Sequence, residues 1–201
     1  QGKSTTWLNS EDASNYGGKI EKLITIAKPD SEYLEKLGLR FNNTLKDVKG
    51  EVEPNESANI TFADAKYDKG LVLNKLMKLK YDINLKETFS IRFKVFVDAA
   101  TPDFIKIVRL TDSFSNYLDV YLDGGKIHIK RSDGIQAECE FSYKKYLDYI
   151  SVMITQSNVD LTLDYSAEYA NIKDSVRVDC EPLTLFTKLY FGAQYDWQNQ
   201  I

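Results

Sequence analysis

Apolar and polar residues alternate along most of the chain from Gly38 onward. The segment 89–96, with the sequence Phe-Ser-Ile-Arg-Phe-Lys-Val-Phe, shows this most clearly. Because successive side chains of a strand point to opposite faces, the pattern predicts a strand with one buried face. The same reasoning predicts further strands at 104–110, 117–122, 126–131, 135–141, 150–155, 159–165 and 187–193.

Turn sequences rich in glycine separate several of these strands. Asp123-Gly124-Gly125 joins 117–122 to 126–131, and Ser132-Asp133-Gly134 leads into 135–141. Glycine accepts the positive φ that tight hairpins require, so both sequences indicate antiparallel hairpins. Short strands at this spacing, with almost no helical periodicity, predict an all-β protein with two antiparallel sheets.

The first 37 residues have a different pattern. Residues 1–19 are rich in Ser, Thr, Asn and Gly, which predicts a loosely ordered arm. Residues 19–27 predict a short strand that ends before Pro29, and 30–37 predict one or two helical turns that end at Gly38. With 201 residues, we expect one domain, in which an N-terminal part (1–37) packs on a β-sandwich (38–201).

Composition narrows the range of partners. The net charge of −4 provides no overall positive field for a phosphate backbone, so we expect no nucleic-acid partner. No apolar run approaches the roughly 20 residues that cross a bilayer, so we expect no membrane insertion. The two cysteines, Cys139 and Cys180, are interpreted either as buried thiols or as a disulfide formed in an oxidising compartment.

Five segments follow one another in an order that resembles a known family. They are 39–47, 67–73, 88–97, 119–129 and 189–193. In this order they resemble the concanavalin A-like lectin/glucanase superfamily, in particular its laminin-G-like jelly rolls, over residues 38–194. The resemblance implies a two-sheet jelly-roll sandwich. The family's closing strand would follow Trp197, so either strand 19–27 fills that edge or the sequence is a piece of a longer protein.

Some members of this superfamily are glycoside hydrolases, which need two carboxyl groups beside the scissile bond. Glu138 and Glu140 form an alternating pair within a predicted strand, but the Glu and Asp pattern typical of these hydrolases is absent. His128, the single histidine, lies between Ile127 and Ile129 and is expected on the exposed face of a strand. We therefore expect a protein that is not an enzyme.

The resemblance implies a ligand site that combines an aromatic ring with Asn and Asp side chains. Two segments have this mixture, one between predicted strands and one at the C-terminus. The candidate ligand-binding residues are Asp112, Phe114, Asn116, Tyr117, Tyr195, Asp196 and Trp197. The alternative is that Phe114 and Trp197 cover the end of the hydrophobic core.

Calcium is common among the proteins that the chain resembles. Asp112, Asp123 and Asp133 are acids in or beside predicted turns and are the candidate calcium ligands. Turns also favour Asp for backbone reasons, so we expect a protein without a cofactor, with calcium as the alternative.

The leading hypothesis is a non-catalytic recognition module of an extracellular, cell-surface or virion-tail protein, with a glycan or surface receptor as its partner. A structural domain that joins other domains or subunits of a larger assembly is the first alternative. A glycoside hydrolase is the second.

Overall fold

The structure of the chain is a computed structural model. It describes residues 37–64, 69–74, 76–97, 101, 103–113, 115–139, 149–168, 170–183 and 185–192, together with the backbone of 20–23. Every element in these ranges is a strand, a turn or irregular, and none is a helix long and apolar enough to cross a membrane.

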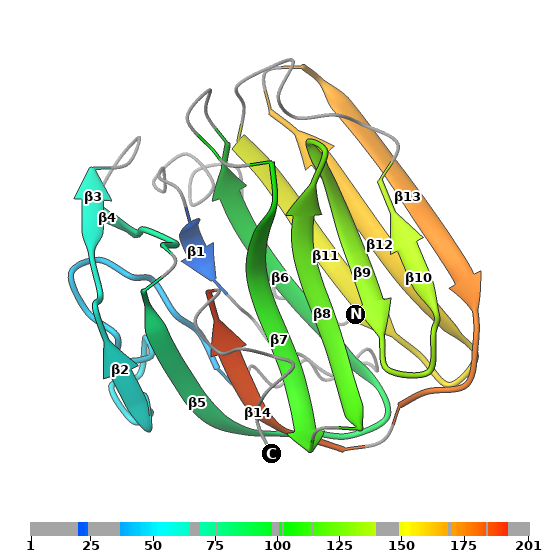
Figure 1. Cartoon of the computed structure of the whole chain (residues 1–201), viewed down its shortest axis with the longest axis horizontal. Coiled ribbons are helices and arrows are strands. Elements are labelled where there is room, and N and C mark those ends of the chain that lie inside the picture. Colours follow the sequence, from blue (N-terminus) through cyan, green and yellow to red (C-terminus); the bar gives the residue numbers. More distant parts are fainter. Residues whose placement is uncertain are drawn as a thin grey trace, which may run out of the picture.

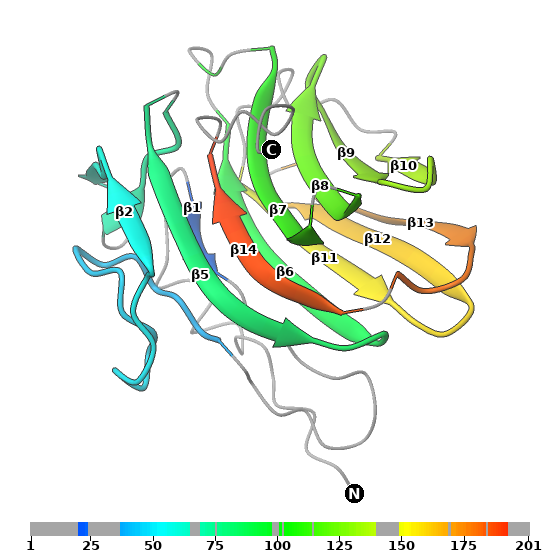
Figure 2. The ribbon, with the colours of Figure 1, turned by 60° about the horizontal axis from the view of Figure 1, so that its bottom comes forward.

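Two antiparallel sheets lie face to face and form the sandwich (Figures 1 and 2). The five-stranded sheet has the order β1 (Ile20–Leu23), β6 (Phe89–Phe96), β11 (Tyr149–Gln156), β12 (Asp160–Ala167) and β13 (Ile172–Asp179). The seven-stranded sheet has the order β10 (Gln136–Glu138), β9 (Lys126–Arg131), β8 (Asn116–Asp123), β7 (Ile105–Ser113), β14 (Phe186–Phe191), β5 (Lys78–Leu85) and β2 (Glu56–Ala58). A separate ribbon pairs β3 (Phe62–Asp64) with β4 (Lys69–Leu71).

The core fills the space between the sheets, because the apolar member of each alternating pair points inward. In the five-stranded sheet, Ile154 of β11 lies opposite Ile91 of β6 and Leu163 of β12, and all three are fully buried. In the seven-stranded sheet, Val120 of β8 lies opposite Ile129 of β9, and both are likewise buried. The contact between these two apolar faces stabilises the fold, at roughly 25 cal/mol for each Å² removed from water.

The predicted fold class is confirmed. Consecutive strands β7 to β10 and β11 to β13 form two meanders, while β14 inserts between β7 and β5 as in a jelly roll. The predicted strand at 19–27 includes β1, which pairs with β6 at one edge of the five-stranded sheet. The predicted helical turns at 30–37 lie outside the described residues, except for Leu37, and residues 1–19 lie outside them altogether.

Both cysteines are free thiols. Cys139 is buried, and its Sγ lies 3.2 Å from the backbone nitrogen of Ile127, which donates to it. Cys180 is half-buried, and its Sγ accepts a hydrogen bond of 3.0 Å from Arg131. The interpretation as buried thiols is therefore right for Cys139, whereas Cys180 is a half-buried thiol, and the alternative of a disulfide is wrong.

Candidate functional site

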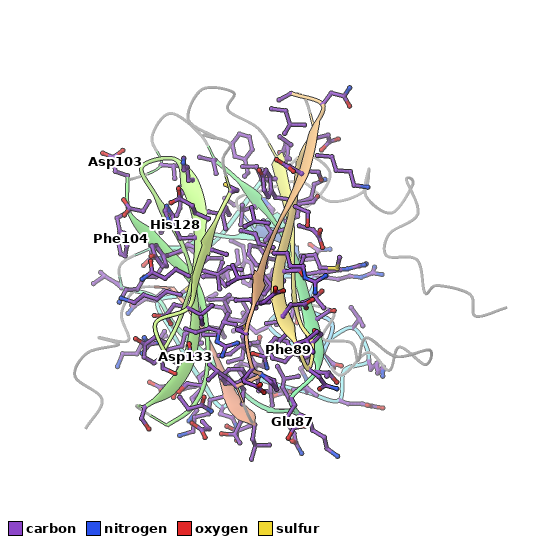
Figure 3. The ribbon with its side chains drawn as sticks, turned by 90° about the vertical axis from the view of Figure 1, so that its right-hand side faces the viewer. Glu87, Phe89, Asp103, Phe104, His128 and Asp133 are labelled. Carbon is purple, nitrogen blue, oxygen red and sulfur yellow. The ribbon has the colours of Figure 1, made fainter. Side chains whose placement is uncertain are left out.

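The outward face of the seven-stranded sheet gathers aromatic and charged side chains, and the β8–β9 hairpin sets its geometry. Gly124 and Gly125 have φ of 55° and 82°, as a two-residue hairpin turn with two left-handed positions requires. This turn places Tyr121 opposite His128 and Asp119 opposite Lys130. Because Ile127 and Ile129 are buried on the inner face, His128 lies on the outer one, as Figure 3 shows.

Three rings meet on this face, and we call Phe104, Tyr121 and His128 the aromatic platform. The rings of Tyr121 and His128 stack almost parallel, with centroids 5.1 Å apart and 8° between their planes. The ring of Phe104, just before β7, lies 5.5 Å from that of Tyr121. Phe104 is 50% exposed, so the platform presents an apolar edge to solvent. Large exposed aromatic surface on a rigid sheet is typical of binding sites.

Polar groups hold the platform in place and border it. Nδ1 of His128 lies 3.3 Å from Glu138, and Nε2 of the same ring lies 3.3 Å from the backbone oxygen of Asp123. Lys126 donates a hydrogen bond of 3.1 Å to Glu138. This hydrogen bond and the charge of Lys126 lower the pKa of Glu138 below its ordinary value. Glu138 is therefore an ionised acceptor beside the rings.

A charge pair lies beside the platform, on neighbouring strands. Arg109 of β7 and Asp119 of β8 form two parallel hydrogen bonds of 2.5 and 2.7 Å, the geometry in which a guanidinium binds a carboxylate most firmly. The ring of Tyr117 stacks on the Arg109 guanidinium at 4.3 Å. Burial raises the pKa of Asp119, although Arg109 opposes that shift. The pair is sheltered and forms a rigid part of the face.

The outer face of the seven-stranded sheet carries more basic than acidic side chains, unlike the chain as a whole. The register of the seven strands turns seven basic and five acidic described side chains outward. They are Lys78, Lys80, Lys106, Arg109, Lys126, Lys130 and Lys188, with Glu56, Asp82, Asp119, Asp123 and Glu138. Since the whole chain carries −4, this face has a local positive excess on an acidic protein. Such an excess attracts anionic ligands.

The ligand-binding residues predicted from the sequence are only partly described. Tyr117 lies on the outer face against Arg109, and Asn116 begins β8 and accepts a hydrogen bond of 2.9 Å from Thr111 through its backbone oxygen. Asp112 lies near the end of β7, beside the same hairpin. Phe114, Tyr195, Asp196 and Trp197 lie outside the described residues. The structure therefore places one predicted ring, that of Tyr117, on the outer face, next to the charge pair.

The three candidate calcium ligands do not come together. Asp112 and Asp133 lie at one end of the β8–β9 hairpin, and Asp123 lies at the other, beside the Gly124-Gly125 turn. Asp133 forms an ion pair with Arg131 and accepts a hydrogen bond of 3.2 Å from the backbone of Ile135. Among the described ranges, no group of three or more His, Cys, Asp or Glu could hold a metal ion.

The candidate hydrolase pair is described only at Glu138, since Glu140 lies outside the described residues. A general acid at this position would need a raised pKa so that it could carry a proton at neutral pH. Lys126 has the opposite effect, because it lowers the pKa of Glu138. Glu138 therefore acts here as a charged hydrogen-bond acceptor.

The aromatic platform was not predicted from the sequence. His128 was expected on the exposed face of a strand and Glu138 on a solvated strand face, and neither Phe104 nor Tyr121 was among the candidate residues. One available signal was the turn: a two-residue loop at Gly124-Gly125 pairs Asp123 with Lys126, and therefore Tyr121 with His128. The position of Phe104 had no such local signal.

The comparisons with known proteins identify the fold. No protein-family model matches the chain, and no curated protein sequence matches it. The receptor-binding domain of botulinum neurotoxin D superposes with a TM-score of 0.58 at 14% identity, over 87% of this chain and 45% of that one. The ligand-binding domain of serotype D in complex with N-acetylneuraminic acid superposes with a TM-score of 0.57 at 14% identity, over 86% and 43%.

A third structure, the receptor-binding domain of the C/D mosaic serotype, superposes with a TM-score of 0.56 at 14% identity, over 86% of this chain and 43% of that one. The chain thus spans less than half the length of each of these three structures. At such identities the likeness concerns the fold alone. The chain has the lectin-like jelly-roll fold that its resemblance to concanavalin A-like proteins implied.

Proposed function

We propose that the chain is a non-catalytic recognition module that binds an acidic glycan on the outer face of its seven-stranded sheet. The observation that carries the proposal is the aromatic platform, where Phe104 is half exposed and Tyr121 stacks on His128. The apolar face of a sugar ring packs well against such rings, while nearby polar groups orient its hydroxyls.

The polar surroundings of the platform suit a sugar. Glu138 is an ionised acceptor for hydroxyl groups, and Lys126 beside it is a donor. Both come from strands of the rigid sheet and not from loops, so their positions are held by the β-ladder. A site of this kind needs no large cavity, because a sugar can pack against the exposed ring of Phe104 and the edge of the stacked pair.

The charge of the face supports an acidic sugar over a neutral one. Burial raises the pKa of Asp119 overall, but Lys106 and Lys130 lie close enough to oppose that shift. Together with Arg109, they put three cations around a single carboxylate. A carboxylate or sulfate group on the ligand would reduce this excess, and attraction of that kind weakens as salt is added.

The solved structures support the class of function. One of the toxin domains with this fold was solved with N-acetylneuraminic acid, which is an acidic sugar. The likeness covers 43% of that domain, so the ligand position proposed here depends on the geometry of this face alone. Glycans of this kind are met on cell surfaces, which is why we propose an extracellular, cell-surface or virion location.

Binding to an array of acidic and neutral glycans, followed by calorimetry, tests the proposal. We expect Phe104→Ala and Tyr121→Ala each to weaken binding of the best acidic glycan roughly three- to tenfold, since aromatic contacts of this kind contribute about 0.5–1.5 kcal/mol. Leu76→Ala is the matched control, because Leu76 is exposed but belongs to a turn before β5.

The control should bind like the unchanged protein. A glycan that binds equally well to both platform variants would show that its site lies elsewhere. Repeating the measurement in EDTA tests the calcium alternative directly. Release of sugar from polysaccharides that is lost in Glu138→Gln would replace the proposal with a hydrolase.

A further inference from the structure

Strand β13 (Ile172–Asp179) forms a long open edge of the five-stranded sheet. One side of β13 pairs with β12 over its whole length, and no strand within the described part of the chain pairs with the other side (Figure 1). β13 has eight residues, whereas the other sheet edges, β1, β2 and β10, have four, three and three. An edge of this length is a template for pairing with another strand.

Two copies of β13 can pair antiparallel about a twofold axis perpendicular to the sheet. Such an axis keeps the inner face of each sheet on the same side, so inward residues must lie opposite inward residues. Val176 and Val178 point inward, because they pair with Leu163 and Leu161, which are buried in the core. The axis must therefore lie between one residue and its own copy in the partner, and not between two successive residues of each strand.

The charges of β13 and the length of strand that each register pairs together select one position for that axis. An axis at Ser175 would place Lys173 opposite Arg177, and an axis at Arg177 would place that residue opposite its own copy. Both arrangements bring like charges together. An axis at Val178 would place Arg177 opposite Asp179, but it would pair only the last three residues of β13. An axis at Val176 instead pairs the strand from Lys173 onward and places Lys173 of one copy opposite Asp179 of the other, twice in the dimer. Opposite charges that face each other across strands stabilise the pairing, and like charges destabilise it.

We propose that β13 is a self-association edge, and that two copies of this chain pair through it with Val176 on the twofold axis. Val176 would then contact its own copy, and Val178 would lie at the margin of the same contact. Both side chains are only half-buried in the single chain, so the pairing removes further apolar surface from water. Lys173 and Asp179 are exposed on the outer face of the sheet, where Asp179 also lies 3.4 Å from Arg177 of its own chain.

Asp174 is the feature of β13 that opposes this pairing. An acid that points inward on an edge strand is one way in which sheets avoid association. Here its carboxylate already accepts hydrogen bonds from the Tyr165 hydroxyl (3.1 Å) and the backbone of Ser175 (2.7 Å). These bonds need not break in the dimer, where Asp174 lies opposite Val178. Two cross-strand ion pairs and the backbone ladder oppose its cost.

In this dimer the two proposed ligand sites would lie on the same side of the molecule. The two five-stranded sheets would join into one ten-stranded sheet, and the twofold axis would leave both seven-stranded sheets on the same side. Both outer faces would therefore look in one direction. Two sites that face the same way can bind one glycan-covered surface together, which raises the overall affinity without any new contact.

Sedimentation equilibrium of the full chain without any glycan tests the dimer separately from the proposed function. We expect the unchanged protein to form dimers as its concentration rises. Lys173→Asp and Asp179→Lys should each weaken the dimer about tenfold or more, since either change turns two attractive pairs into two repulsive ones. Lys130→Asp, on the other sheet, is the matched control and should dimerise normally.

A mixture of the two single variants gives the sharpest result. In the mixed dimer, Asp at 173 of one copy faces Lys at 179 of the other, and the second pair is attractive as well. We therefore expect the mixture to form dimers although neither variant does so alone. A monomeric unchanged protein at every concentration, or variants that dimerise as well as it does, would overturn the proposal. Failure of the mixture to dimerise would overturn the register.

Discussion

Arg131 is the largest fully buried side chain among the described residues, with an exposure of 1%. It points inward from the end of β9 and makes hydrogen bonds to several parts of the fold. Its guanidinium donates to the backbone oxygen of Glu181 at 2.7 Å, to Cys180 at 3.0 Å and to Gln156 at 3.5 Å, and it forms an ion pair with Asp133. One buried cation therefore holds one end of the sandwich together.

Replacing Arg131 tests this role. Arg131→Met keeps the apolar stem but removes every donor, so the carbonyl of Glu181 and the amide of Gln156 lose a partner inside the protein. We expect a loss of about 3 kcal/mol in the free energy of unfolding, measured with urea at neutral pH. Lys130→Met is the matched control on the exposed side of the same strand, and it should change stability by less than about 0.5 kcal/mol.

The stability lost in Arg131→Met should depend on pH, because Arg131 forms an ion pair with Asp133. Burial alone would raise the pKa of Asp133, but the hydrogen bonds from Arg131 and Ile135 lower it below its ordinary value of 3.8. Because the folded pKa lies below the unfolded one, the stabilisation by this group is complete above about pH 4 and disappears as the pH falls through the folded pKa. The difference in the free energy of unfolding between Arg131→Met and the unchanged protein should therefore become smaller in acid. A constant difference down to pH 2 would contradict this account.

At the scale of elements, the β8–β9 hairpin sets the register of the aromatic platform. A Cβ at Gly124 would meet nothing within 4 Å, so substitution there tests the backbone alone. Since φ is 55°, we expect Gly124→Val to cost roughly 1–2 kcal/mol in thermal or urea unfolding. Gly124→Asn should be nearly neutral, because Asn accepts left-handed turn positions. Equal losses in both variants would show that the turn does not depend on φ.

A strand can be recognised from the sequence when the residues that point inward are large and apolar. β6 matches the predicted strand at 89–96, since its inward positions are all large and apolar. β13 was not predicted, because Asp174 occupies one of its inward positions and its valines are only half-buried. β5 was overlooked, although Leu79 and Tyr81 alternate with lysines as clearly as the residues of any predicted strand.

The candidate site was predicted less well than the strands. Its residues belong to four separate segments, whereas the predicted ligand-binding residues lie in or beside loops, which often carry function. The pairing of Tyr121 with His128 was available from the turn, as described above. The approach of Phe104 to Tyr121 follows a register shift in β7 between Lys106 and Val108, for which the sequence offers no reliable sign.

At the scale of the whole molecule, packing and hydrogen bonds hold the two layers together without a covalent cross-link. Both cysteines of the sequence are free, and the core joins the two sheets. We expect the midpoint of thermal unfolding to be the same with and without a reducing agent. Thiol titration of the denatured protein, without prior reduction, should find both cysteines reactive. A lower midpoint in reductant would indicate a cross-link between chains.

The sequence alone determined the strand class, the positions of most strands and their turns, because side-chain alternation and glycine φ are properties of neighbouring residues. It also determined which face of β9 is apolar and that His128 lies on the other face. Only the tertiary structure decided the strand order, with β14 between β7 and β5 and β13 at an edge. It also decided that Phe104 joins Tyr121 and His128 in one platform. These features depend on contacts between segments far apart in the chain, and the energies of such contacts cannot be derived from a local sequence pattern.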